Sequence, residues 1–396
     1  MYNFDKLNNI CIVGAGVMGQ GIAQVSLMAG YTVTLIDLNE ENLENGVKKI
    51  EQSLLKMEAK GNLGDIISID DLLRKCIKSI DLVSAVQDAD FIFEAVTEKI
   101  EVKKRVCHKV MQNSPDHSIF ASNTSTFRIT DIAEGSKRPE QVIGMHFFAP
   151  VPYQCCVEVM KGKKTSDEVL DMCVILGENL PCVKGKRLSV RIQKESPGFI
   201  ANRLLIPSLI YSNWIFDLAH ERNIPWEQID ADARTEKLVQ MGPCQLTDYL
   251  GIDVSYNSMK SYEKYISPDF APGKVLSKFV LEGTLGRKTG KGFYDWTKGR
   301  PNINLRKKAG LFNPEIILAI QLNEGCRLLE EGIISGYKII DDIMLKGTSM
   351  PGPFSAGKHN YDNWSKLLDD IAEKTGKEYL KPCNLMKSGD FLKMRR

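Results

Sequence analysis

A glycine-rich pattern near the N-terminus places the strongest constraint on the fold of this chain. Gly14, Gly16 and Gly19 form a G-x-G-x-x-G motif between a short apolar run and a stretch of helical character. In this context the first glycine allows a tight turn, the second lets a pyrophosphate approach the backbone, and the third lets the helix pack on the strand. The sequence therefore predicts a nucleotide at the helix N-terminus. Its expected contacts are Gly14, Gly16, Val17, Met18 and Gly19.

The second predicted strand indicates which nucleotide binds. Thr32–Ile36 is apolar and β-branched, and Asp37 follows it directly. A carboxylate at this position accepts hydrogen bonds from the free hydroxyls of an adenosine ribose and repels a 2′-phosphate. Leu38 and Asn39 come next, so this stretch offers no arginine for such a phosphate. The sequence predicts NAD as the cofactor, rather than NADP.

The order of the elements predicts an α/β Rossmann domain followed by all-α domains. Short apolar runs alternate with helical stretches at about 18–30 and 40–60. After Ser196-Pro-Gly198 the chain reads as helical to about Val280, and again after a linker at Thr297–Ala309. The expected strands are Ile10–Val13, Thr32–Ile36, Phe91–Phe93, Ile119–Ala121 and Val142–Gly144. The expected domains are residues 1–194 (NAD-binding), 195–298 (helical, for substrate and dimerisation) and 299–396 (a second helical domain).

The last of these domains reads as a degenerate repeat of the one before it. An offset of roughly 110 residues aligns Asn213 with Asn323 and Pro272 with Pro382. Chance similarity between two helical segments is the alternative.

Composition excludes several classes of partner. Lys and Arg number 52 against 50 Asp and Glu, without a concentrated basic face, so we expect no nucleic acid. No apolar run approaches the roughly 18 residues of a membrane span, so we expect no membrane partner. The 10 cysteines are scattered, and the neighbours Cys155 and Cys156 fit neither a zinc site nor a favourable disulfide. We expect reduced thiols, no metal and a cytoplasmic location.

Three polar residues have the properties of a proton-transfer site. Ser125 and His146 follow predicted strands and should lie at the carboxyl edge of the sheet, while Glu158 lies in an apolar run. Hydride removal from a secondary alcohol also requires a base for the hydroxyl proton. A histidine whose other ring nitrogen faces a carboxylate suits this task. Taken alone, however, a histidine in such a place is more often a core residue.

Several ordered motifs resemble those of the 3-hydroxyacyl-CoA dehydrogenases. The resemblance runs from the glycine loop to about Trp296, and the last segment resembles the second helical domain of the longer, multifunctional members. It implies NAD-dependent oxidation of an (S)-3-hydroxyacyl-CoA to a 3-ketoacyl-CoA, a reaction of fatty-acid β-oxidation. The motifs are Ala121-Ser-Asn-Thr-Ser125, Ile143-Gly-Met-His-Phe-Phe-Ala-Pro-Val-Pro152, Val157-Glu-Val159, Ser196-Pro-Gly-Phe-Ile-Ala-Asn-Arg203, Met241-Gly-Pro243 and Lys288-Thr-Gly-Lys-Gly-Phe-Tyr294.

The resemblance also implies roles for individual residues. His146 would be the general base and Glu158 its carboxylate partner, while Ser125 would bond the substrate oxygen and Asn202 would help to hold the acyl-CoA. Ser53 and Lys60 match positions that contact CoA, although a solvated helix face would explain them equally well. Further cofactor contacts are implied for Glu94, Lys99, Ser125 and Lys288.

Two departures from the family pattern concern the substrate. Ala149 stands where the family has asparagine in His-Phe-Phe-Asn-Pro, and the stretch Lys184–Glu195 is longer and more basic than usual. Loss of the asparagine removes a polar contact and opens space. We therefore hypothesise an acyl group that is bulkier or more functionalised than a short straight chain.

Other interpretations remain open from the sequence. One is a dehydrogenase of a free hydroxy acid, of the gulonate or carnitine type. Another is an NAD-binding structural or regulatory protein without turnover. A homodimer is expected, although a second helical copy in the same chain could cover the apolar face that shorter relatives bury by dimerising.

Overall fold

The chain folds into two compact units. The computed structural model describes residues 7–63, 68–192, 194–234 and 241–396. The first unit comprises Met1–Ala201, Gly332–Ile334 and Ile339–Gly352, and the second comprises Asn202–Glu331, Ser335–Lys338 and Pro353–Arg396. The units divide between Ala201 and Asn202, whereas the sequence predicted a boundary at residue 194. The predicted third domain does not form a unit of its own, and part of it belongs to the first unit.

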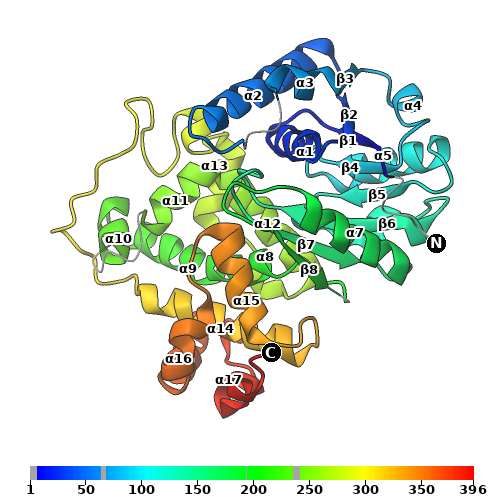
Figure 1. The fold of residues 1–396 in the computed structure, drawn as a ribbon. Helices are drawn as coiled ribbons and strands as arrows, with labels where there is room; N and C mark the ends of the chain where they lie inside the picture. The colour runs from blue at the N-terminus through cyan, green and yellow to red at the C-terminus, as the bar shows by residue number, and fades with distance from the viewer. Residues whose placement is uncertain (1–6, 64–67, 193, 235–240) are drawn as a thin grey trace. The chain divides into compact units, whose positions relative to one another are not determined.

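An eight-stranded sheet forms the centre of the first unit, in the order β3-β2-β1-β4-β5-β6-β7-β8 (Figure 1). Neighbours from β3 to β6 run parallel, whereas β7 is antiparallel to β6 and β8 is parallel to β7. The strand order reverses between β1 and β4, and ligands of such sheets bind in the crevice at this point. The strands are β1 (Asn9–Val13), β2 (Thr32–Ile36), β3 (Cys76–Ser79), β4 (Phe91–Glu94), β5 (Ile119–Ser122), β6 (Val142–Phe147), β7 (Cys156–Lys161) and β8 (Leu188–Ile192).

Helices connect these strands, as the predicted Rossmann architecture requires. The longest, α2, begins after Asn39, whose side chain accepts a hydrogen bond from the Asn42 N–H. Its buried positions recur at helical spacing, so one face packs on α1 and the other meets water. The helices of this part are α1 (Val17–Met28), α2 (Glu40–Glu58), α3 (Ile69–Arg74), α4 (Leu82–Ala85), α5 (Ile100–Asn113), α6 (Ile129–Ala133) and α7 (Asp167–Asn179).

The second unit is helical, which confirms the predicted class of the C-terminal part. An ion-pair cluster stabilises this unit, in which the buried Arg203 contacts the buried Glu324 at 3.0 Å and the half-exposed Glu331 at 2.6 Å. The Tyr379 hydroxyl donates to the Glu324 carboxylate at 2.8 Å. The helices are α8 (Ala201–Leu205), α9 (Ser208–Glu221), α10 (Trp226–Ala233), α11 (Pro243–Leu250), α12 (Ile252–Tyr265), α13 (Lys274–Glu282), α14 (Pro314–Glu330), α15 (Tyr337–Ile343), α16 (Pro353–Thr375) and α17 (Asn384–Ser388). Of these, α8 and α15 each cross the boundary between the units.

The same hydrogen bond occurs twice in this unit. The Asn213 side chain accepts from the Gly273 N–H at 3.0 Å, and the Asn323 side chain accepts from the Cys383 N–H at 2.8 Å. Both donors directly follow the prolines that the sequence offset aligns. The 3₁₀ turns Pro268–Phe270 and Glu378–Leu380 keep the same offset of about 110 residues. We therefore propose that the unit contains two copies of one helical motif.

The structure corrects the expectation that all cysteines are reduced thiols. Cys155 is bonded to Cys182, with Cα atoms 5.6 Å apart. The two residues are 27 positions apart, and the crossover from β7 through α7 to β8 brings them together. Inspection of the neighbouring pair Cys155 and Cys156 could not reveal this partner. Cys156 is free and buried.

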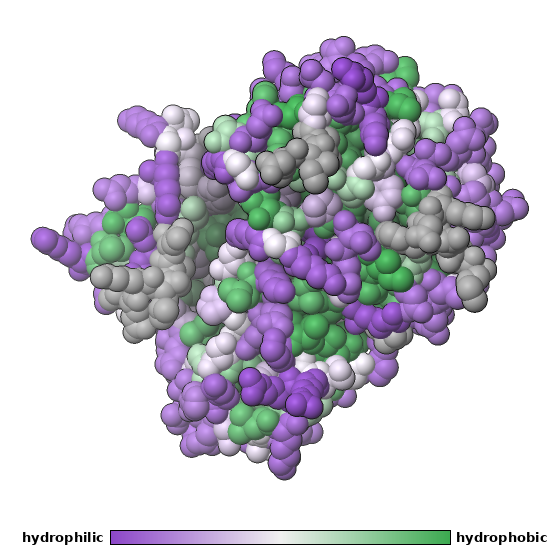
Figure 2. All heavy atoms as spheres, viewed as in Figure 1, coloured by the Kyte–Doolittle hydropathy of each residue, from purple (hydrophilic) through white to green (hydrophobic). Residues whose placement is uncertain are grey.

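Hydrophilic residues dominate the face drawn in Figure 2, and hydrophobic residues occupy smaller areas between them. Among the helices of the described residues, none combines the length and the apolar character that crossing a membrane requires.

Candidate active site

The glycine loop after β1 has the shape that a nucleotide requires. Gly14 has φ +111°, and a Cβ there would lie 2.5 Å from the Ala95 carbonyl oxygen. A Cβ on Gly19 would lie 1.7 Å from the Gly14 carbonyl oxygen, so only glycine allows this close approach. In contrast, a Cβ on Gly16 would meet nothing within 4 Å. Gly16 therefore borders open space at the start of α1, where an anion can approach the backbone.

The first turn of α1 is available for such an anion. No side chain caps this helix, and no acidic residue lies in its first turn. Val17, at its first position, is 74 % exposed. The uncapped N–H groups and the positive end of the helix dipole favour a negatively charged group here.

Asp37 lies at the end of β2, beside the glycine loop. Its Oδ2 accepts from the Ala15 N–H at 2.7 Å. Its Oδ1 accepts from the Leu38 N–H and from the Asn42 side chain, both at 2.7 Å. These bonds hold the carboxylate beside the glycine loop, as the predicted ribose contact requires. The residues present therefore fit NAD.

His146 and Glu158 form a buried pair on adjacent strands. The antiparallel register of β6 and β7 places the two residues directly opposite each other. The Nδ1 atom of His146 lies 2.7 Å from Oε2 of Glu158. The other oxygen, Oε1, accepts from the N–H groups of Ile200 and Ala201, both at 2.9 Å. Three donors thus converge on a carboxylate that is 0 % exposed, which compensates its burial.

Two aromatic rings flank the imidazole of His146. The Phe148 ring lies 4.8 Å from it in an edge-on arrangement, and the Phe199 ring lies 5.2 Å from it. Phe199 has φ +56°, an uncommon backbone conformation for a bulky residue. The histidine is itself 7 % exposed, so its ring is enclosed on most sides.

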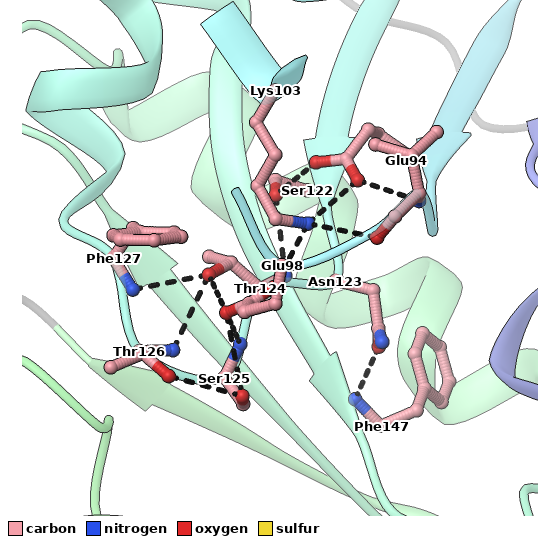
Figure 3. Close-up of polar contacts among 11 residues, drawn as sticks. Glu94, Glu98, Lys103, Ser122, Asn123, Thr124, Ser125, Thr126, Phe127 and Phe147 are labelled. Carbon is pink, nitrogen blue, oxygen red and sulfur yellow. Dashed lines mark hydrogen bonds and ion pairs between the residues drawn. The ribbon is translucent and has the colours of Figure 1, made fainter. Parts of the chain in front are cut away.

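The loop after β5 is tied to the end of β6. The Asn123 side chain accepts from the Phe147 N–H at 2.9 Å, as Figure 3 shows. Ser125, two residues farther along, is half-buried, and its N–H donates to Glu98 at 3.0 Å. The structure therefore links the loop that carries Ser125 to the strand that carries His146.

A buried lysine supports this loop through Glu98. Figure 3 shows the Lys103 ammonium between two carboxylates, 2.7 Å from Glu94 and 3.1 Å from Glu98. Glu98 also accepts from the Thr124 hydroxyl at 2.6 Å. Burial acts to lower the pKa of Lys103, but the two carboxylates outweigh it and raise the pKa. Burial acts to raise the pKa of Glu98, but Lys103 and the hydrogen bonds of Thr124 and Ser125 lower it.

This network changes the roles expected for Glu94 and Lys99. Glu94 is 0 % exposed, and its oxygens accept from Lys103, from the Val96 N–H and from the Ser122 hydroxyl. A direct cofactor contact does not fit this position, because the carboxylate faces protein groups. Lys99 is exposed at the start of α5. Glu98 and Lys103 were not predicted, although they have the same spacing as Glu94 and Lys99.

The basic stretch 184–195 has a structural explanation. Its residues 188–192 form β8, and the preceding Arg187 is 2 % exposed. The Arg187 guanidinium donates to the carbonyls of Val151, Gln154, Leu180 and Pro181, and it lies 5.5 Å from the Phe147 ring. Arg187 therefore holds the loop after β6, and this role gives no support to a special acyl group. Ala149, in contrast, is exposed in that loop.

The remaining predicted residues lie outside this cluster. Ser53 is half-buried on α2, and Lys60 is exposed just after α2 ends. Asn202 directly follows Ala201 and is the first residue of the second unit. Within that unit, Lys288 forms an ion pair with Asp253.

Comparison with known proteins adds independent evidence. The family model described as 3-hydroxyacyl-CoA dehydrogenase, NAD binding domain, matches residues 9–186, and the model for the C-terminal domain matches residues 198–296. A mitochondrial hydroxyacyl-coenzyme A dehydrogenase of Rattus norvegicus is 34% identical over 302 residues, which are 73% of this chain and 91% of that protein. A probable 3-hydroxybutyryl-CoA dehydrogenase of Bacillus subtilis is 34% identical over 74% of this chain and 98% of its own length.

A solved structure resembles the whole chain. The crystal structure of 3-hydroxybutyryl-CoA dehydrogenase from Escherichia coli matches with a TM-score of 0.81 and 25% identity. The match covers 98% of this chain and 99% of that one, so it includes the part beyond residue 296.

Proposed function

Because the chain belongs to the 3-hydroxyacyl-CoA dehydrogenase family, a family of NAD-dependent oxidoreductases, we propose that it oxidises a 3-hydroxyacyl-CoA with His146 as the general base. The observation that carries this proposal is the buried His146–Glu158 pair, with 2.7 Å between Nδ1 and Oε2. A carboxylate at this distance keeps the proton on Nδ1 and leaves Nε2 free to accept another. The pair is therefore suited to taking a proton from an alcohol.

The reaction requires removal of a proton and a hydride from the same substrate. His146 takes the proton of the 3-hydroxyl at Nε2, and the resulting imidazolium is stabilised by Glu158. The Ile200 and Ala201 N–H groups fix the Glu158 carboxylate, so the imidazole keeps its orientation as its charge changes. Ser125 bonds the substrate oxygen, and the Glu98–Lys103 network holds its loop in place.

The cofactor supplies a nicotinamide that accepts the hydride from C3 of the substrate. We assign its pyrophosphate to the N-terminus of α1 with Gly14, Gly16, Val17, Met18 and Gly19, and its adenosine ribose to Asp37. Ser125 and Lys288 remain proposed contacts. We propose that Glu94 binds Lys103 and does not contact the cofactor. Lys99 is exposed.

The substrate is proposed to be a CoA ester. Lys60 is exposed and can reach a phosphate, whereas Ser53 and Asn202 are proposed contacts of the ester. Ala149 replaces a polar residue in an exposed position, which supports an acyl group that is larger or more functionalised than a short straight chain.

A panel of substrates tests the proposal. The full-length protein would be incubated with NAD and with 3-hydroxyacyl-CoA esters that are short, long, dicarboxylic, cyclic or aromatic, and with the matching free acids. NADH formation from esters but not from free acids is expected. Preference for the free acids would support the gulonate- or carnitine-type interpretation instead, and no turnover with any of them would support a non-catalytic protein. Highest kcat/KM for short straight chains would refute the hypothesis built on Ala149.

Location and assembly form part of the same proposal. We propose a cytoplasmic homodimer, to be tested by fractionation and by light scattering. Structural disulfides are rare in the cytoplasm. Thiol titration of the freshly purified protein therefore tests whether the Cys155–Cys182 bond is present. Eight reactive thiols after denaturation are expected with the bond intact, as the eight remaining cysteines are free.

A further inference from the structure

A glycine makes room for each of the two phenyl rings that flank His146. A Cβ on Gly144 would lie 2.9 Å from the Cζ atom of Phe199 and 2.8 Å from the Cδ1 atom of Ile129. A Cβ on Gly347 would lie 2.9 to 3.0 Å from three atoms of the Phe148 ring. Real Cβ contacts are longer, because carbon atoms pack best at about 3.5–4.0 Å. Both rings therefore occupy space that a larger residue would take.

The two glycines come from very different parts of the chain. Gly144 lies on β6, two residues before His146, whereas Gly347 lies in the segment Ile339–Gly352 of the first unit. This segment forms a π-helical turn at Met344–Thr348. Ser349, just after the turn, lies 3.3 Å from the Gln154 side chain in the loop that follows Phe148. The family models end at residue 296, so Gly347 and Ser349 lie outside the part that they match, whereas Phe148 and Gln154 lie inside it.

Space, rather than backbone conformation, explains the glycine at 347. Its φ lies outside the region that L-residues avoid, and the three nearest atoms to a Cβ all belong to Phe148. Phe148 is 9 % exposed, and the neighbouring Met344 is 0 % exposed. A methyl group at 347 would therefore have to displace the ring within a closely packed region.

We propose that Gly347 is a positioning residue for His146: it admits the Phe148 ring, which packs against the imidazole at 4.8 Å and limits its movement. The inference rests on the proposed function, because it assumes that the orientation of His146 limits turnover. It assigns a role in catalysis to the segment Ile339–Gly352.

The expected effect of Gly347→Ala follows from the distances. The Phe148 ring must move by roughly 0.5–1 Å to restore an ordinary contact with the new methyl group. Its ring lies 4.8 Å from the imidazole, so the displacement is transmitted to His146. Since a misplacement of about 1 Å can cost about 10²-fold in rate, we expect kcat to fall by about 10-fold. The Kd for NAD should stay within about twofold of the wild-type value, because α1 and Asp37 are untouched.

A double-mutant cycle separates this role from general damage to the fold. Phe148→Leu removes the ring atoms that a methyl group at 347 would meet. In that background, Gly347→Ala should change kcat by less than about twofold. Leu345→Ala is the matched control, because Leu345 lies in the same turn and is 60% exposed. It should keep wild-type kcat. The proposal is overturned if Gly347→Ala lowers kcat equally in the wild type and in Phe148→Leu. It is also overturned if Gly347→Ala leaves kcat of the wild type unchanged.

Two further outcomes are decisive. If Gly347→Ala does not fold, the variant that combines Gly347→Ala with Phe148→Leu must fold and must have the kcat of Phe148→Leu. A combined variant that does not fold, or that has a lower kcat than Phe148→Leu, overturns the proposal. If the wild type turns over no 3-hydroxyacyl-CoA, the proposed function fails, and the NMR signals of the His146 imidazole still test the contact. Gly347→Ala should then shift these signals through the ring current of Phe148, and Leu345→Ala should not. No shift with Gly347→Ala refutes the inference independently of activity.

Discussion

Replacement of Glu158 by glutamine should abolish most of the activity while preserving the shape of the site. In the wild type, Oε1 of Glu158 accepts from two buried N–H groups at 2.9 Å each. A glutamine can keep both bonds only if its amide oxygen takes this place. Its NH₂ group then faces Nδ1 of His146.

The effect of Glu158→Gln on kcat depends on which of its two orientations the glutamine amide adopts. The reverse orientation would leave the Ile200 and Ala201 N–H groups without an acceptor, at about 1–3 kcal/mol each. The first orientation is thus favoured by roughly 2–6 kcal/mol. In this orientation Nδ1 must accept from the amide, so the neutral ring carries its proton on Nε2. The base is then absent, and kcat should fall by about 10²–10⁴-fold.

The assay is steady-state NADH formation at saturating substrate, with the Kd for NAD measured in parallel. Glu195→Gln is the matched control, because Glu195 also binds a backbone N–H, that of Thr130 at 2.6 Å, but faces no histidine ring in the contacts described. It should keep wild-type kcat. A Glu158→Gln variant with kcat within about threefold of the wild type would refute the tautomer argument.

Three further changes test other parts of the site. Asp37→Ala should weaken NAD binding by about 10-fold in a calorimetric titration, through loss of the ribose acceptor; unchanged affinity would contradict the assignment. The lowered pKa of Glu98 means that its stabilisation is present above the usual carboxyl pKa and is lost as the pH falls through the lowered value. Melting curves of Glu98→Gln should therefore depend less on acidic pH than those of the wild type, and equal dependence would refute this. Arg187→Met removes a donor to four carbonyls and should cost about 3 kcal/mol, or roughly 6–12 °C in Tm. Arg191→Met, at a half-exposed residue, should leave Tm almost unchanged, and equal losses in the two variants would count against the special role of Arg187.

The parts of the fold that the sequence predicted are those with strong local patterns. The strands β1, β2, β4, β5 and β6 are buried apolar runs, and all five were predicted. β3 was missed because Ile77 and Lys78 are exposed at the edge of the sheet. β8 was missed because serine and arginine interrupt its apolar residues.

The pair at the centre of the site could be expected from motifs, but its geometry could not. Residues 146 and 158 become neighbours only because β7 turns back against β6. The sequence could not show that Glu94 and Glu98 both contact Lys103, because Glu94–Lys99 and Glu98–Lys103 have the same spacing along the chain. The contact of Gly347 with Phe148 spans about half the chain, and no local pattern encodes such a contact.

The most direct test of the account is the turnover of His146→Gln with a 3-hydroxyacyl-CoA that the wild type oxidises. We expect kcat to fall by about 10²–10⁴-fold, the usual contribution of a general base. The Kd for NAD should remain at the wild-type value, because the glycine loop and Asp37 do not contact this ring in the described structure. Near-wild-type turnover in this variant would remove His146 from the mechanism and contradict the central claim.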